Sequence, residues 1–218
     1  MKIATVIIGF FLIILFSIAV LYIKKNENRT LEKTNENINN ENTKTTILLW
    51  EDNYLSAELI PKENLEFAIK ETKRIKKHAE EHFDGNGFTE ITKINKIPFS
   101  TEKKEILTSK ITDLLESIGL VKYGRVLYYG GGTPTEIENQ NTIVYGELKS
   151  GIFIEQENNK IEHIWIDSQN WQEISKTKIK DGLIEIGEMF DLILVDWNST
   201  QVIDLKKESE IEKYLWNE

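Results

Sequence analysis

Hydrophobic and polar positions divide this chain into three parts, the first of which is continuously apolar. Residues 3–23 read IATVIIGFFLIILFSIAVLYI and contain no charged side chain. As a helix, these residues would span roughly 31 Å, about the hydrocarbon thickness of a bilayer. The run predicts a transmembrane anchor over residues 1–23, with Ile3, Phe10 and Ile23 inside the span. A cleaved signal peptide is the alternative, but its apolar core would be unusually long and only Lys2 would precede it.

Residues 24–45 show no apolar periodicity at all. They include seven Asn, four Glu, four Lys and four Thr, with Leu31 and Ile38 as the aliphatic residues. Such a segment cannot bury enough surface to offset the entropy lost on ordering. We predict a flexible linker with a reach of about 26 Å.

Basic residues next to the apolar run indicate which side of the membrane the rest of the chain occupies. Lys24, Lys25 and Arg29 follow the run, whereas Lys2 precedes it. The positive-inside rule therefore favours a cytoplasmic domain, and we expect a single-pass protein of a bacterial inner membrane. The opposite orientation stays open, because a first segment often inserts as a signal anchor.

Residues 46–218 combine patterns of period 3.6 with patterns of period 2. The first two predicted strands, and the last two, are close enough to form hairpins. Short connections and clustered strands favour one α+β domain with a mainly antiparallel sheet and about three packed helices. The predicted helices cover 61–83, 100–118 and 176–190, with a short fourth helix around Ile211 and Leu215; the predicted strands cover 46–50, 54–60, 88–97, 121–129, 142–148, 151–156, 161–167, 191–197 and 201–205.

Charge and cysteine content narrow the functional classes. The whole chain has a net charge of −9, and residues 46–218 are more acidic than residues 1–45. This balance argues against nucleic-acid binding, which requires neutralised phosphates, and suits either a basic protein partner or simple solubility. The absence of cysteine excludes disulfides, zinc-thiolate sites and cysteine nucleophiles. We expect no cofactor.

Two histidines four residues apart are the candidate metal ligands. His78 and His82 would share one helix face, and Asp84 is a further candidate ligand. The metalloprotease pattern places a general base directly after the first histidine, but Ala79 stands there. A membrane-anchored metal-dependent hydrolase using His78 and His82 is therefore the alternative function. The simpler interpretation is a pair of surface imidazoles near a helix C-terminus.

Other chemical motifs are incomplete. Residues 84–90 resemble the middle of a calcium loop, but His82 and Lys93 occupy the places of its outer carboxylates. The three glycines at 130–132 lack the lysine and helix of a phosphate-binding loop. His163 is in phase with buried strand positions and is expected to be a satisfied, partly buried side chain. We assign no catalytic residue.

Three predicted strands end in a tryptophan beside an acid. If these ends converged, they would form an acidic, aromatic patch suited to a basic protein partner. Alternatively, each tryptophan packs in the core while its neighbour faces water. The candidate partner-binding residues are Trp50, Asp52, Trp165, Asp167, Asp196 and Trp197.

Residues 81–89 (EHFDGNGFT) and 191–198 (DLILVDWN), with Ile203–Leu205, resemble a group of small, poorly characterised bacterial proteins. Related acidic α+β domains often act as immunity proteins, which neutralise a cognate toxin by binding it. The resemblance covers residues 46–218 and implies a non-catalytic, immunity-like inhibitor, to which the predicted anchor adds a membrane tether. The membrane anchor departs from the usual cytosolic immunity protein. A third function, support of an envelope assembly, differs from the first only in its partner.

Overall fold

The computed structural model describes residues 46–50, 53–130, 133–137, 141–147, 150–167 and 173–216. The predicted anchor, with Ile3, Phe10 and Ile23, and the predicted linker lie outside the described residues. Among the residues that the structure describes, no helix is both long and apolar enough to cross a membrane. Residues 45–218 form one compact unit, and the fold below is the fold of that unit.

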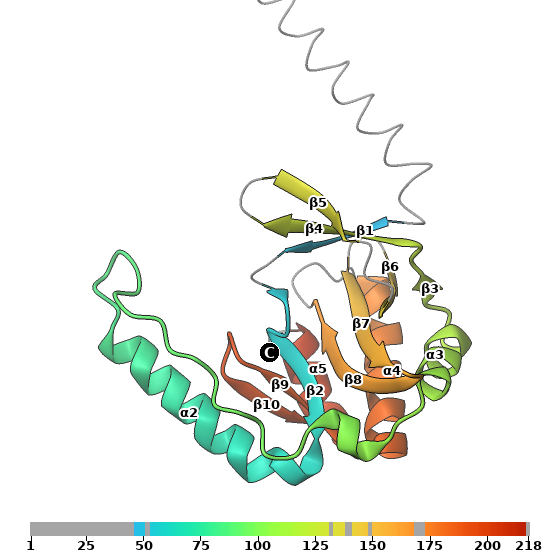
Figure 1. Ribbon diagram of the computed structural model, residues 1–218. Helices are drawn as coiled ribbons and strands as arrows, with labels where there is room; N and C mark the ends of the chain where they lie inside the picture. The colour runs from blue at the N-terminus through green and yellow to red at the C-terminus, as the bar shows by residue number, and fades with distance from the viewer. Residues whose placement is uncertain are drawn as a thin grey trace, which may run out of the picture. The chain divides into compact units, whose positions relative to one another are not determined.

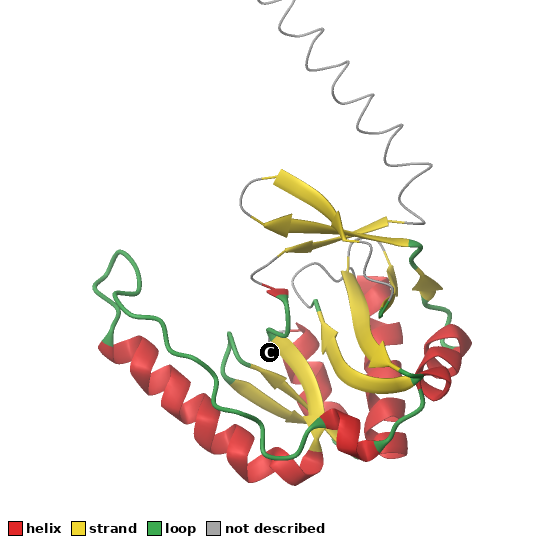
Figure 2. Ribbon diagram, in the orientation of Figure 1, coloured by secondary structure: helices red, strands yellow, loops and turns green. Residues whose placement is uncertain are grey.

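Two sheets form the framework of the unit (Figures 1 and 2). The larger sheet has the strand order β10-β9-β2-β8-β7-β6-β3, and every neighbouring pair in it is antiparallel. Its strands are β2 (Ala57–Pro61), β3 (Val121–Lys122), β6 (Thr142–Glu147), β7 (Ser150–Glu157), β8 (Lys160–Ile166), β9 (Leu192–Asp196) and β10 (Gln201–Asp204).

The smaller sheet has the order β1-β4-β5. In it, β1 (Thr46–Trp50) runs parallel to β4 (Arg125–Gly130), and β4 is antiparallel to β5 (Thr133–Ile137). The predicted α+β class with a mainly antiparallel sheet is therefore confirmed. The described residues contain four α-helices, the last of which is the short fourth helix predicted around Ile211 and Leu215: α2 (Leu65–Glu81), α3 (Thr108–Ser117), α4 (Glu173–Phe190) and α5 (Glu208–Trp216).

One face of the large sheet packs on helices α3, α4 and α5. Alternate strand residues point to this face, among them Ile152, Ile154 and Ile164. The helix stripe predicted for α4 meets them, because Ile179 and Leu183 are both 0% exposed. This layer holds the largest buried apolar cluster of the described residues.

The opposite face of the large sheet has two separate covers. The small sheet covers one part, where Ile47 and Leu49 of β1 pack with Phe153 and Trp165. Helix α2 covers another part, where Ala68 joins a cluster formed mainly by β2 and β9 residues. The order β9-β2-β8-β7 places these covers side by side on one sheet face.

The predicted hairpin between residues 46–50 and 54–60 is wrong, although both strands exist. Strand β1 belongs to the small sheet, whereas β2 lies between β8 and β9 in the large one. All five residues of β2 are buried. A strand buried on both faces needs a neighbour along each edge, which a single hairpin partner cannot provide.

Three other predicted elements differ from the structure. The predicted strand 88–97 is a loop, apart from an isolated bridge between Phe83 and Phe88. The predicted helix 100–118 is interrupted at Glu105, whose φ of 51° lies in the left-handed region. A 3₁₀ turn, Thr101–Lys104, precedes Glu105, and α3 follows it. The predicted strand 121–129 divides into β3 and β4, which lie in different sheets.

Candidate functional site

Helix α2 and the segment after it form an extension of the unit, which we call the arm (residues 65–100). Figure 1 shows the C-terminal end of α2 lying away from both sheets, with the following segment returning beside the helix. Polar contacts fix this return. At its base, the buried Asn64 side chain accepts a hydrogen bond from Phe99 N at 3.0 Å and donates one to Phe99 O at 2.8 Å.

Glu71 fixes the middle of the arm. Its Oε1 accepts hydrogen bonds from Arg74 Nη2 at 2.6 Å and Asn95 N at 2.7 Å, while Oε2 accepts bonds from Arg74 Nε and Asn95 Nδ2. Arg74 in turn donates to Thr92 Oγ1 and Lys93 O. The hydrogen bond from Arg74 is the main cause that lowers the pKa of Glu71 to about 2. The carboxylate is therefore a charged, buried connection between helix and returning segment.

A tight turn reverses the chain at the tip of the arm. Asp84 N donates to Gly87 O, and Asp84 Oδ1 accepts hydrogen bonds from Asn86 N at 2.9 Å and Gly87 N at 3.0 Å. Thr89 N then donates to His82 O at 2.8 Å. This turn returns residue 90 to the side of the helix.

The structure brings His78, His82 and Glu90 together at this point. Their ligand atoms all lie within 4.8 Å of one another. Glu90 Oε2 is 2.9 Å from His82 Nε2 and 3.9 Å from His78 Nε2, and the two imidazole rings stack with centroids 4.0 Å apart. His82 Nδ1 lies 2.8 Å from His78 O. Because a carbonyl oxygen can only accept, Nδ1 of His82 carries a proton there, and Nε2, which faces the Glu90 carboxylate, is the nitrogen that is left for a proton or a metal ion.

Asp84, the third ligand candidate from the sequence, is not part of this cluster. Its Oδ1 accepts the backbone hydrogen bonds of the turn, and these bonds lower the pKa of its carboxyl group. The third ligand is Glu90, which sequence spacing alone does not indicate. Only the prediction of a tight turn over residues 84–87 could have suggested that a residue shortly after it faces the histidines.

The arm also exposes large apolar side chains. Phe83 and Phe88 are 55% and 65% exposed, with ring centroids 5.5 Å apart. Ile91 and Ile94 on the returning segment are 89% and 45% exposed. Near the tip, the returning segment therefore exposes its apolar side chains, whereas Ile97, nearer the base, packs against the cluster under α2.

The predicted acidic, aromatic patch is not found at the surface. Trp165 and Trp197 are 1% and 4% exposed and belong to the clusters under the small sheet and under α2, respectively. Asp167 and Asp196 are also buried; Asp196 Oδ2 accepts a hydrogen bond from Tyr214 Oη at 3.0 Å. The interpretation of the two tryptophans as surface anchors is therefore wrong, because they fill the core beneath the two covers. Asp52 and the side chain of Trp50 lie outside the described residues.

A histidine and a glutamate pair on the sheet face that carries the two covers. His163 Nδ1 lies 2.8 Å from Oε1 of Glu58, which is 4% exposed. This hydrogen bond is the main cause that raises the pKa of His163. The prediction that His163 is satisfied and partly buried is confirmed. Glu58 was not predicted, because its only signal in the sequence is a lone charge within an apolar strand. His163 provides the partner of this buried charge, and we assign the pair a structural role.

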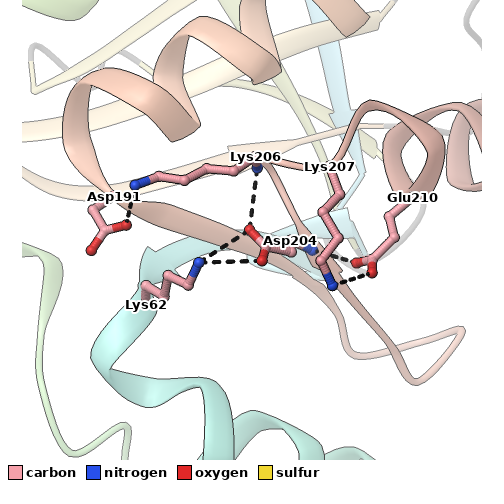
Figure 3. Close-up of polar contacts among 6 residues, drawn as sticks. All are labelled: Lys62, Asp191, Asp204, Lys206, Lys207 and Glu210. Atoms are coloured by element: carbon pink, nitrogen blue, oxygen red, sulfur yellow. Dashed lines mark hydrogen bonds and ion pairs between the residues drawn. The ribbon is translucent and has the colours of Figure 1, made fainter.

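Charged side chains also gather where α2 begins, at the ends of β9 and β10 (Figure 3). Lys62 Nζ lies 3.2 Å from Asp204 Oδ2, and Lys206 Nζ lies 2.8 Å from Asp191 Oδ1. The carboxyl of Asp204 experiences burial, which raises its pKa, but hydrogen bonds from Lys206 N and Lys62 outweigh this effect and lower it. Each acid thus has a basic partner, and the group ties elements together. The remaining pair in Figure 3 is Lys207 with Glu210.

Comparison with known proteins adds no relative: no family description, curated protein or solved structure matches this chain. We therefore infer the function from the arm and from the chemistry of its side chains.

Proposed function

We propose that this chain is a membrane-tethered, non-catalytic protein-binding domain that contacts its partner through the arm. The observation that supports the proposal is the exposure of Phe83, Phe88, Ile91 and Ile94 on one extension of the fold. Exposed aromatic and aliphatic side chains gathered in one region are typical of protein interaction sites. The order imposed by Glu71 and Asn64 lowers the entropy lost when the arm binds.

The charges of the arm define the chemistry of the partner. Exposed lysines lie along α2 and the returning segment, including Lys70, Lys73 and Lys96, whereas Glu81, Asp84 and Glu90 are exposed acids near the tip of the arm. The charge of the lysines favours a protein surface with an apolar region and an acidic region beside it. The acidic partner surface inferred from the arm differs from the basic partner expected from the net charge of −9. Binding of a basic partner stays a prediction for the rest of the domain.

A photocrosslinking amino acid at Ile91 tests the proposal in native membranes with the full-length chain. We expect a discrete protein adduct whose crosslinked region is apolar and acidic, and an adduct yield at least about tenfold lower with Phe88→Asp, as expected for a central interface residue. Met189, which is 53% exposed on α4, provides the control position. Adducts formed only with lipid, or formed equally at Ile91 and Met189, would overturn the proposal.

The resemblance to immunity proteins suggests a narrower form, in which the partner is a toxin. In that form, a toxin gene adjacent to this gene is expected, and co-expression of this chain would protect cells from that toxin. Protection that survives Phe88→Asp would argue against toxin binding through the arm. The envelope-assembly function predicts instead a crosslinked partner of the envelope and no protection.

A further inference from the structure

We infer that His78, His82 and Glu90 form a binding site for a transition-metal ion of the Zn²⁺ type, which fastens the tip of the arm. The inference goes beyond partner binding and does not depend on it. Two imidazole nitrogens and one carboxylate oxygen are a known zinc-binding set, and such a site leaves a fourth position for water.

The distances suit a tetrahedral ion. Zinc ligands at about 2.0–2.1 Å in tetrahedral geometry are about 3.3 Å from one another. The separations of Glu90 Oε2 from His82 Nε2 and His78 Nε2, 2.9 Å and 3.9 Å, lie on either side of this value. To bind one ion, the two stacked imidazole rings have to rotate out of their parallel arrangement, so that both Nε2 atoms and Glu90 Oε2 point at it.

The surroundings of the ligands are also those of a metal site. The contact from His82 Nδ1 to His78 O is the kind of second interaction that fixes the tautomer and orientation of a metal-bound imidazole. The side chains of His78 and His82 are 22% and 31% exposed, so an ion can enter from solvent. Nitrogen ligands select zinc-like ions over Ca²⁺ and Mg²⁺, which prefer oxygen. Ala79, at the position of the general base in the metalloprotease pattern, removes a group needed for hydrolysis but none of the ligands that bind the ion.

The place of the site in the arm indicates what the ion does. Asn64 fixes the base of the returning segment and Glu71 fixes its middle, each through hydrogen bonds to that segment. At the tip, Thr89 N donates to His82 O, and the Glu90 side chain, which is 63% exposed, lies against the two histidines. An ion bound to helix and returning segment together would be a further connection, and would fix Phe88 and Ile91 in one arrangement.

Calorimetric titration of the tag-free, full-length chain in detergent with ZnCl₂ tests the site. We expect one Zn²⁺ per chain, no heat with MgCl₂, and an affinity at least about tenfold lower for Glu90→Gln, since even loss of a secondary contact costs this much. Glu80→Gln removes an exposed carboxylate from the same helix and is expected to bind as the unchanged chain does. Absence of Zn²⁺ binding, or equal affinity of the two variants, would overturn the inference.

Amide hydrogen exchange tests the fastening itself. Zn²⁺ is expected to slow exchange over residues 83–94 in the unchanged chain and in Glu80→Gln, but not in Glu90→Gln. Equal exchange with and without Zn²⁺ in the unchanged chain would show that the ion does not fasten the arm. Because neither measurement involves a partner, failure of this site leaves the protein-binding proposal to its own crosslinking experiment.

Discussion

At the scale of single residues, the arm depends on polar side chains that look ordinary in the sequence. Glu71 is one of many charges on a helix rich in them, yet its side chain is 5% exposed and joins Arg74 to Asn95. A buried carboxylate that accepts several hydrogen bonds is costly to remove, because its donors lose their partner. Hydrogen bonding thus fixes the shape of the arm together with the apolar packing of Phe67, Ile75 and Ile97.

Glu71→Gln is expected to lower the free energy of unfolding at pH 7 by about 2–3 kcal/mol, since a neutral amide cannot replace the charge-assisted bonds. The folded-state pKa of Glu71 is lowered to about 2 from an ordinary value of 4.5. The contribution of ionised Glu71 to the free energy of unfolding is therefore full above pH 4.5 and is lost as the pH falls from 4.5 toward 2. Urea unfolding at pH 7 and at pH 3 measures this change.

Glu66→Gln provides the control for Glu71→Gln, because Glu66 is exposed in the first turn of the same helix. We expect a change within about 0.5 kcal/mol for this control. A difference between Glu71→Gln and the unchanged chain that is the same at both pH values would contradict the assigned role of Glu71.

At the scale of elements, close approach between α4 and the β10–α5 connection limits what the helix can carry. A Cβ added at Gly187 would collide with Leu205 Cβ and would meet the carbonyl carbon and oxygen of Leu205 at 2.9 Å and 3.0 Å. At Gly182, an added Cβ would meet only Ile118 Cδ1, at 2.7 Å, which is the end of a flexible side chain.

Gly187→Ala is expected to destabilise the protein by about 1–3 kcal/mol, because backbone must move to admit the methyl group. Gly182→Ala, on the same helix, is expected to cost less or to stabilise, since alanine favours a helix by about 1 kcal/mol over glycine. Chemical unfolding of both variants compares them directly. A Gly187→Ala variant as stable as Gly182→Ala would contradict the close packing of α4 on Leu205.

Sequence patterns predicted elements well wherever one face of the element is buried along its whole length. The hairpin of β9 and β10, and helices α4 and α5, belong to this group, because packing follows their periodicity. The apolar stripe predicted over residues 61–83 is covered at Ala68, which is buried, but not at Phe83, which lies beyond the end of α2 and is 55% exposed. Local periodicity cannot tell a covered stripe from an uncovered one, so the arm was not predictable.

Predictions about sites are limited for a related reason, because sites depend on contacts between distant segments. The spacing of His78 and His82 indicated a shared helix face, which the stacked rings confirm. Glu90 joins them only because the turn at Asp84 reverses the chain. Strand pairing was hard to predict for the same reason. The strand-forming residues of β1 were visible in the sequence, but its parallel partner β4 was not.

At the scale of the whole molecule, the orientation of the predicted anchor decides which partners the arm can meet. Lys24, Lys25 and Arg29 follow the apolar run and favour a cytoplasmic domain. A fluorescent protein fused after Glu218 is therefore expected to fluoresce, and alkaline phosphatase fused there to be inactive. Replacing Lys24 and Lys25 with Asn is expected to weaken or reverse this result. An active phosphatase fusion to the unchanged chain would place the domain outside.

The position of β2 in the large sheet has a consequence for how the protein is made. Strand β2 is synthesised early, yet its neighbours β8 and β9 follow more than a hundred residues later. At translation rates of about 5–20 residues per second, β2 waits roughly ten seconds for the strands that pair with it. During this interval, the buried sequence Ala57–Pro61 emerges from the ribosome without its sheet. The nascent chain therefore has to be kept from aggregating until its C-terminal third is available.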